Sequence, residues 1–193
     1  MLIRSANEAD LDALLGCVVT APISWAHPDR LTASLADGPY TYDRIWVAEQ
    51  DDQIMARAVW WGVPDEPFPI ALDCLYVHDA VDDSVGLASD VLAAAHTTFR
   101  AAGADELPAY HIFLPGSWRN DHAVVEALGW RRTAAAKVGL VDELERLRYE
   151  WTPQAGIPAD RGRLTFRPEP DDEAMLEVFV QQAGTSLENV FLQ

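Results

Sequence analysis

The stretch ALDCLYVHDAVDDSVGLASDVLAAA, Ala71 to Ala95, decides the fold of this chain. Its first eight residues, Ala71 to His78, are almost wholly apolar, which is typical of a strand buried on both faces. An aspartate-rich turn follows, and from Ser84 to Arg100 the apolar residues recur at helical spacing until an Ala-Ala-Gly stop. The stretch therefore predicts a strand that passes through a short acidic turn into a long helix.

The residues before this stretch predict three more strands and a helix. Leu2 to Ser5 is a short strand, and Asn7 with Asp10 three residues later has the spacing of a helix capping box, followed by leucines and valines at helical spacing. Arg44 to Glu49 and Gln53 to Val63 are strand-like and are separated by turn residues, so they predict a hairpin. The intervening loop contains a short predicted helix over Asp29 to Ala36.

The residues after the long helix predict a further strand, a helix and a hairpin. Ala109 to Leu114 is strand-like, and His122 to Leu128 is a short helix that Gly129 ends. Trp130 to Val141 and Leu147 to Trp151 can pair as a closing hairpin. The predicted order is β-α-β-β-β-α-β-α-β-β, which makes the fold α/β with a mixed sheet flanked by helices.

Composition limits the partners and the compartment. The 193 residues carry a net charge of −17, so the overall field repels nucleic acid and anionic membranes and attracts cationic ligands such as amines. Only two cysteines occur, no run of apolar residues is long enough for a membrane span, and we expect a cytoplasmic protein. A single lysine among 14 basic residues indicates a GC-rich bacterial source. The histidines and cysteines show no metal-ligand spacing, so no metal is expected.

Three segments together resemble the GNAT family of acetyl-CoA-dependent N-acetyltransferases. They are LIRSANEADLDALL at the start, the strand-turn-helix stretch in the middle, and HAVVEALGW near the end, so the resemblance covers about Met1 to Trp151. It implies a GNAT-like sheet, acetyl-CoA as co-substrate and direct transfer of an acyl group to a primary amine. The expected acceptor is a small-molecule amine, which the acidic surface suits but does not identify.

The resemblance implies where the co-substrate lies. The main chain of Leu75, Tyr76 and Val77 corresponds to the strand that binds the pantetheine arm, and the loop Asp83, Ser84, Val85, Gly86, Leu87, Ala88 corresponds to the pyrophosphate loop at a helix N-terminus. Gly86 and Ala88 match the family pattern. Asp83 stands where the family has Gln or Arg, and its charge weakens phosphate binding by about 1–2 kcal/mol, or roughly ten- to thirtyfold.

Catalytic residues are likewise carried over from the family. Asp73 corresponds to the carboxylate that deprotonates the amine, although a carboxylate satisfied by backbone or arginine is the competing interpretation. The family places a proton-donating tyrosine where this chain has Val125. Tyr110, His111 or Tyr76 then substitutes as donor, or the thiolate leaves unaided, or the domain does not catalyse.

The chain is predicted to contain a second, incomplete copy of its own beginning. RLTFRPEPDDEAMLEVFV, Arg163 to Val180, has the pattern of residues 1–19, namely a β-prone run, an arginine, an acidic turn and helical apolar spacing. We therefore expect a GNAT-like domain over residues 1–152, a linker over 153–162 and a partial repeat over 163–193. Because one strand and one helix cannot bury their apolar face, this segment is expected to dock on the first domain, to form a homodimer or to be disordered.

Two functions follow as hypotheses. The first is an acetyl-CoA-dependent N-acyltransferase acting on a small primary amine. The alternative is a catalytically degenerate module that binds acyl-CoA or a partner domain and has a structural or regulatory role, which Asp83 and Val125 favour. A third possibility is an unrelated α+β protein whose glycine turn is accidental.

Overall fold

The computed structural model describes the chain apart from residues 20–22, 24–27, 65, 147–151, 157–170 and 183–193. Its contacts divide it into two units, Met1–Glu145 and Arg146–Gln193. The first unit holds the sheet and the helices that cover it. The second unit contains, within its described residues, a short 3-10 turn η4 (Pro153–Ala155) and helix α5 (Asp172–Gln182).

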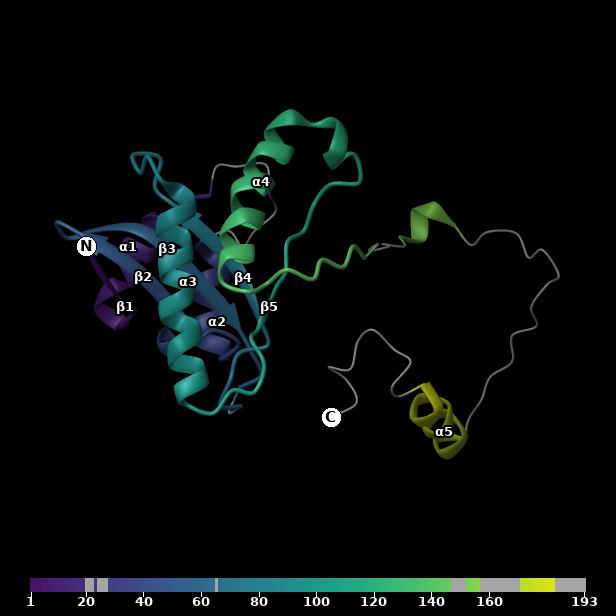
Figure 1. Ribbon diagram of the computed structural model, residues 1–193. Coiled ribbons are helices and arrows are strands. Elements are labelled where there is room, and N and C mark those ends of the chain that lie inside the picture. Colours follow the sequence, from purple (N-terminus) through teal and green to yellow (C-terminus); the bar gives the residue numbers. More distant parts are fainter. Residues whose placement is uncertain (20–22, 24–27, 65, 147–151, 157–170, 183–193) are drawn as a thin grey trace. The chain divides into compact units, whose positions relative to one another are not determined.

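The first unit is built on one five-stranded sheet whose strands lie in chain order. The strands are β1 (Leu2–Ser5), β2 (Ile45–Gln50), β3 (Gln53–Trp61), β4 (Ala71–Val77) and β5 (Ala109–Tyr110). Strands β1 to β4 pair antiparallel with one another, and β5 pairs parallel with β4 (Figure 1). The mixed sheet with flanking helices confirms the predicted α/β fold class.

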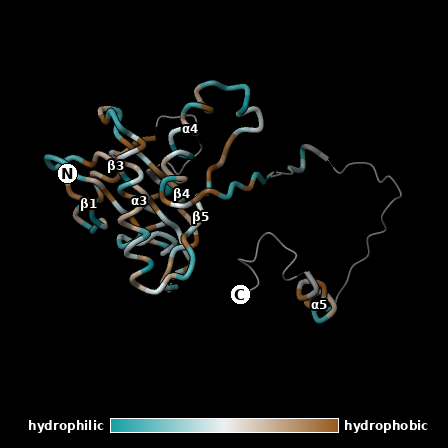
Figure 2. Tube along the Cα trace, in the orientation of Figure 1, coloured by the Kyte–Doolittle hydropathy of each residue, from teal (hydrophilic) through white to brown (hydrophobic). Residues whose placement is uncertain are grey.

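Helices cover both faces of the sheet. They are α1 (Leu11–Gly16), α2 (Pro28–Asp37), α3 (Ser84–Ala101) and α4 (His122–Lys137), with 3-10 turns η1 (Glu8–Asp10), η2 (Tyr42–Arg44) and η3 (Trp118–Asn120). One core packs α3 and α4 against β2, β3 and β4, and a second packs α1 and α2 against the opposite face. Apolar residues accordingly follow the central strands in Figure 2. The double cover explains why β4 is apolar almost throughout.

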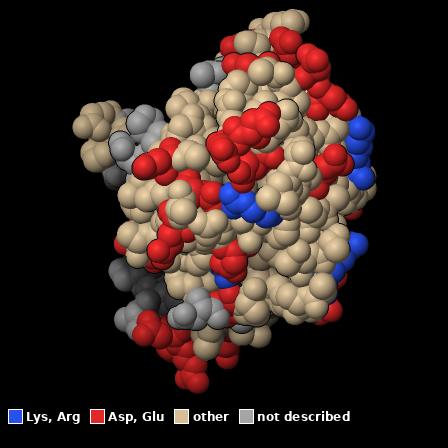
Figure 3. Space-filling model, turned by 90° about the vertical axis from the view of Figure 1, so that its left-hand side faces the viewer, with Lys and Arg blue, Asp and Glu red and all other residues tan. Residues whose placement is uncertain are grey.

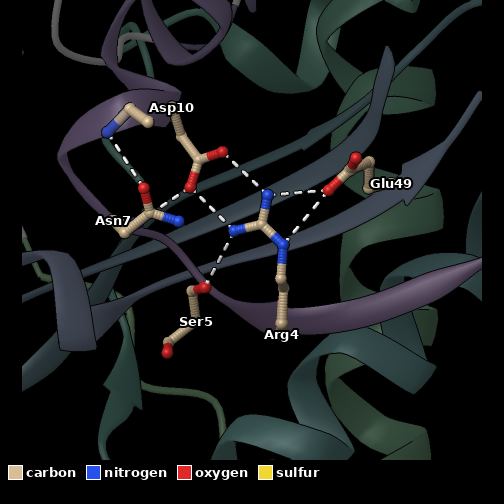
Figure 4. A network of polar contacts seen from close by, with 6 residues as sticks. Arg4, Ser5, Asn7, Asp10 and Glu49 are labelled. Carbon is tan, nitrogen blue, oxygen red and sulfur yellow. Dashed lines mark hydrogen bonds and ion pairs between the residues drawn. The ribbon is translucent and has the colours of Figure 1, made fainter. Parts of the chain in front are cut away.

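The N-terminal strand is fastened to the first turn by Arg4. Its guanidinium donates to both carboxylate oxygens of Asp10 at 2.7 Å and to Glu49 on β2, as Figure 4 shows. The Arg4 hydrogen bond lowers the pKa of Asp10. Asn7 and Asp10 form the predicted capping box, in which the Asn7 side chain accepts from the amide of Ala9 and Asp10 accepts from that of Asn7.

The hairpin between β2 and β3 has the predicted two-residue turn. Gln50 pairs with Gln53, and Asp51 and Asp52 both have positive φ, of 52° and 61°. Positive φ at both central residues matches the twist of the flanking strands, and aspartate tolerates it better than bulkier residues do.

The predicted closing hairpin is wrong over the residues described. Trp130 to Lys137 continue helix α4, which passes through Gly129 without a break, and residues 138–146 contain no strand. The sequence Thr-Ala-Ala-Ala-Lys after Arg132 favours a helix, and Asp121 caps its start by accepting from Ala123 and Val124. A glycine inside a helix costs about 1 kcal/mol, which the packing of α4 against α3 offsets. Leu147 to Trp151 lie outside the described residues.

The predicted strand over Ala109 to Leu114 is shorter than expected. Ala109 and Tyr110 alone form β5, and farther along the chain Phe113 takes part in a single β-bridge. In the second unit, α5 confirms the helical spacing of residues 172–182, whereas the strand expected over residues 164–167 lies outside the described residues. The partial repeat stays a prediction.

The surface of the molecule is acidic, as the composition predicts. Figure 3 shows carboxylates scattered over one face, where they outnumber the basic groups. Within the described residues, no helix combines the length and the apolar character needed to cross a membrane.

Candidate functional site

Strand β4 contains a bulge at Asp73. Val59 on β3 pairs with Cys74 and Trp60 pairs with Leu72, so Asp73 is an extra residue with no partner on β3. Leu72 and Leu75 consequently pack toward α3, whereas Cys74 belongs to the core on the α1 and α2 face. Bulges redirect side chains and end strand pairing, and they are common beside active sites.

The strands β4 and β5 separate at this bulge. Their pairing consists of Ala71 with Ala109 and Leu72 with Tyr110, and the amide of His111 donates to the carbonyl of Leu72 at 2.9 Å. Beyond Leu72 the β4 main chain pairs with no strand on this side within the part of the chain that the structure describes. Ligands of open sheets bind where adjacent strands diverge at their carboxyl ends, so this divergence is the candidate site.

Two cavities follow β4 past the divergence. The first, of about 10 Å³, is close to the minimum that holds one water molecule and is lined by Val19, Ile23, Asp73, Cys74, Leu75, Tyr110, His111, Ile112 and Arg131. The second, of about 120 Å³, is lined by Val18, Val19, Tyr76, Val77, His78, Asp79, Ser84, Trp130 and Arg131.

These linings gather some of the predicted site residues and leave others apart. Asp73, Leu75 and Tyr110 meet at the first cavity, and Tyr76 and Val77 line the second. Ser84 also lines the second cavity, but Asp83 and residues 85–88 line neither. Val125, the position of the missing tyrosine, is exposed on α4 and lines neither cavity.

Asp73 is buried and already has partners. Its carboxylate accepts a hydrogen bond from the hydroxyl of Tyr40, which is itself buried, and Arg30 of α2 approaches it with Nη2 at 3.6 Å. Burial and this hydrogen bond raise the pKa of Tyr40, so Tyr40 remains a donor. These contacts agree with the competing interpretation, in which Asp73 is a carboxylate satisfied by its neighbours. They also hold the carboxylate in a fixed position at the divergence.

The two tyrosines predicted as proton donors lie near arginines. Tyr110 lines the first cavity together with Arg131, and burial raises the pKa of Tyr110. Tyr76 lies 5.9 Å beneath the guanidinium of Arg57, and burial raises its pKa as well. Both phenols therefore keep their protons, and neither is a stronger acid than free tyrosine.

Arg131 is a site residue that sequence reasoning missed. It extends from α4 into the divergence, where its Nε donates to the carbonyl of Leu75 at 3.2 Å and its Nη1 to the carbonyl of Ala127 at 2.7 Å. A signal was present, because Arg131 shares an apolar stripe with residues spaced three and four apart, namely Val124, Ala127, Leu128, Ala134 and Ala135. The mistaken strand over residues 130–141 concealed it.

The N-terminus of α3 is capped by the chain's own carboxylate. Asp83 is the N-cap, its Oδ1 accepts from the amide of Gly86 at 2.7 Å, and its carbonyl accepts from the amide of Leu87 at 3.1 Å. A Cβ at residue 86 would collide with the Asp83 carboxylate, so this glycine is needed to make room for Asp83. Leu87 and Ala88 are buried and face the core. The Asp83 carboxylate thus occupies the position in which an anionic ligand would accept from these amides.

Within the part of the chain that the structure describes, no group of three or more histidine, cysteine, aspartate or glutamate side chains is arranged to hold a metal ion. Both cysteines are buried thiols, and burial raises the pKa of Cys74 to about 11.

Comparison with known proteins gives similarity of fold. No family model matches the chain, and no curated protein does. Among solved structures, the chain is similar to an aminoglycoside 6'-N-acetyltransferase from Acinetobacter haemolyticus, with 20% identity, a TM-score of 0.49, and coverage of 79% of this chain and 98% of the other. It is also similar to the ribosomal-protein-alanine N-acetyltransferase from Brucella melitensis, with 24% identity, a TM-score of 0.35, and coverage of 52% and 68%.

Proposed function

We propose that this chain is an acetyl-CoA-dependent N-acyltransferase that transfers an acyl group directly to a small primary amine. The observation that carries the proposal is the end of the β4–β5 pairing at Leu72, which leaves the main chain of Leu75 to Val77 beside two cavities. An exposed strand edge binds extended ligands through main-chain hydrogen bonds. The pantetheine arm of coenzyme A is extended and contains two amide groups, so it matches such an edge.

The residues at the divergence supply what the reaction requires. Transfer forms a carbon–nitrogen bond and breaks the carbon–sulfur bond of the thioester, and the amine must lose a proton. Asp73 is the carboxylate at the divergence and is our candidate for accepting that proton. Tyr110 and Tyr76 are the candidates for returning a proton to the departing thiolate. Holding the two reactants together contributes several kcal/mol of the rate enhancement, of the order found for oriented reactants.

Two contacts must change before such a ligand can bind. The phosphates would compete with the Asp83 carboxylate for the amide of Gly86, and an amide of the pantetheine arm would compete with Arg131 for the carbonyl of Leu75. The expected affinity for acetyl-CoA is therefore modest, in line with the roughly ten- to thirtyfold weakening that the charge of Asp83 implies.

A second candidate function is a catalytically degenerate module that binds acyl-CoA or a partner domain without turnover. The contact that favours it is the same Asp83–Gly86 hydrogen bond, because a site that satisfies its own donors has less need of a ligand. The segment 163–193 is then our candidate for docking or homodimerisation. Light scattering of the full chain over a hundredfold range of concentration tests this part, since a mass that stays monomeric rejects the homodimer.

Calorimetry with acetyl-CoA, followed by turnover on a panel of small primary amines, tests both functions. Binding with turnover supports the acyltransferase, and binding without turnover supports the degenerate module. An absence of binding up to millimolar acetyl-CoA rejects acyl-CoA binding altogether. The proposal includes a cytoplasmic location, where acetyl-CoA is present and Cys17 and Cys74 stay reduced.

A further inference from the structure

Arg131 separates the two cavities. Its side chain is 4% exposed, and it lines the first cavity together with Asp73 and Tyr110 and the second together with Tyr76 and Ser84. The guanidinium lies 4.2 Å from the ring centroid of Trp130 and donates to the carbonyls of Leu75 and Ala127. It therefore fills the space between β4 and the residues that follow β5.

The position of Arg131 is unusual for a buried cation in this molecule. Arg44 and Arg57 are also buried and also donate to carbonyls, but neither lines these two cavities. Among the described residues no carboxylate contacts Arg131, and burial lowers its pKa. A buried charge without a counter-charge is costly, so a movement of the guanidinium toward solvent would recover part of this desolvation free energy.

The main contact of Arg131 is one that a strand-like ligand needs. Leu75 lies beyond the last β4–β5 pair, so no strand among the described residues pairs with it on that side, and the Nε of Arg131 donates to its carbonyl at 3.2 Å. A ligand amide that paired with this carbonyl would have to displace the guanidinium. The other residue that lines both cavities is Val19, which is smaller than arginine. Once the guanidinium has moved away, the two cavities can therefore join.

We infer that Arg131 is a removable plug, which closes the β4–β5 divergence in the free domain and must leave the Leu75 carbonyl for a ligand to span the two cavities. The ligand's identity as acyl-CoA rests on the proposed function, whereas the plug itself does not. Opening the plug exposes the wall of the first cavity, which includes the thiol of Cys74, 2% exposed in the closed form.

Reaction of Cys74 with the small uncharged reagent methyl methanethiosulfonate measures this opening without acetyl-CoA. Cys17→Ser leaves Cys74 as the single thiol, and its hydroxyl can keep the bond that Cys17 donates to the carbonyl of Ala13. In that background, Arg131→Met should speed labelling roughly tenfold, because methionine fills the stem volume but cannot bond the carbonyl. Removing the nearby positive charge of Arg131 raises the pKa of Cys74 further and would slow labelling, so a faster rate reports access.

Arg132→Met is the matched control. Arg132 is the next residue of α4, is partly exposed, pairs with Glu143 at the surface and lines neither cavity. Its loss should leave the labelling rate unchanged. Thermal melting of each variant checks folding. If Arg131→Met is unstable, Arg131→Lys takes its place. Lysine keeps the charge and a donor, so this variant should label at a rate between that of wild type and the rate expected for Arg131→Met.

The outcomes separate the plug from the proposed function. Equal labelling of wild type, Arg131→Met and Arg132→Met overturns the plug, even if the wild type binds acetyl-CoA. Faster labelling of Arg131→Met with no acetyl-CoA binding in any variant supports the plug and rejects the acyl-CoA function. Faster labelling together with an acetyl-CoA affinity about fivefold tighter than wild type supports both, since one competing hydrogen bond is worth about 1 kcal/mol.

Discussion

The carboxylate of Asp83 accepts a hydrogen bond of 2.7 Å from the amide of Gly86. The chain itself therefore satisfies this amide in the first turn of α3. The same carboxylate occupies the space that a side chain at residue 86 would need. One contact therefore accounts for two features of the sequence, the aspartate in the turn and the glycine three residues later. It also sets up a competition between a structural cap and an anionic ligand.

Asp83→Ser tests that competition. Serine keeps a capping oxygen for the amide of Gly86 and removes the negative charge, so stability should change little while acetyl-CoA binds roughly ten- to thirtyfold more tightly. Asp83→Ala should also tighten binding but should lower the free energy of unfolding by about 1 kcal/mol, because the cap is lost. Calorimetry and urea denaturation give the two quantities.

The control for Asp83 is Asp82→Ser, which removes a neighbouring charge that does not bond Gly86. It should change acetyl-CoA affinity by a few-fold at most. If Asp83→Ser left the affinity at the wild-type value, the helix N-terminus would not be the phosphate site.

Asp73→Asn separates proton transfer from binding. The amide is the same size and can still accept from Tyr40, so the acetyl-CoA dissociation constant should stay near wild type. Turnover should fall about 10²- to 10⁴-fold, the usual contribution of a general base. Asp79→Asn, at the second cavity, is the matched change and should retain activity. Full turnover by Asp73→Asn would leave Asp73 as a structural partner of Tyr40 and Arg30.

His96 makes stability depend on pH. It is 4% exposed, packs against the edge of Trp60 and has no hydrogen bond to either ring nitrogen, and burial lowers its pKa from 6.5 to about 4. Above pH 6.5 the His96 ring is neutral in both the folded and the unfolded chain, so it adds no pH dependence to the free energy of unfolding. As pH falls from 6.5 to 4 the unfolded chain binds the proton and the folded chain does not, so about 2–3 kcal/mol of stability is lost.

His96→Leu should remove this part of the pH dependence. Urea denaturation between pH 7.5 and pH 4 should show the variant gaining on wild type as the pH falls. The exposed His122→Gln serves as control and should follow the wild-type curve. A constant difference between His96→Leu and wild type across this range would mean that His96 takes up its proton in the folded state.

Gly129→Ala tests the corrected course of α4. An added Cβ at residue 129 meets no atom within 4 Å, and alanine is favoured over glycine inside a helix, so unfolding free energy should rise by about 1 kcal/mol. Gly86→Ala, also in a helix, should be destabilising because it displaces the Asp83 carboxylate. If Gly129→Ala lowered the free energy of unfolding instead, the result would favour a helix that ends at Leu128, as the sequence pattern predicts.

Local patterns predicted the framework of the sheet well. The apolar run of β4, the Asp51–Asp52 turn and the capping box of Asn7 each depend on residues that are neighbours in the chain, and each is present in the structure. The course of α4 was misjudged because Gly129 resembles a helix stop in isolation. Packing against α3 decided otherwise, and packing cannot be seen in a window of ten residues.

The candidate site was predicted in part, for a physical reason. The family resemblance indicated Asp73, Tyr110 and the β4 main chain, and the sequence pattern placed these residues on strands. It gave no sign of the bulge at Asp73, of the Tyr40 hydrogen bond or of Arg131 at the Leu75 carbonyl. Those contacts join residues 33 and 56 positions apart in the chain.

The sequence alone determined the acidic charge, the order of strands and helices through α3, and the capping box of Asn7, because charge, periodicity and capping are set by adjacent residues. Only the tertiary structure decided that β4 and β5 part at Asp73 and that Arg131 closes the opening. Strand pairing and burial depend on which distant segments meet, and their free energies appear only when the sheet and its helices have assembled.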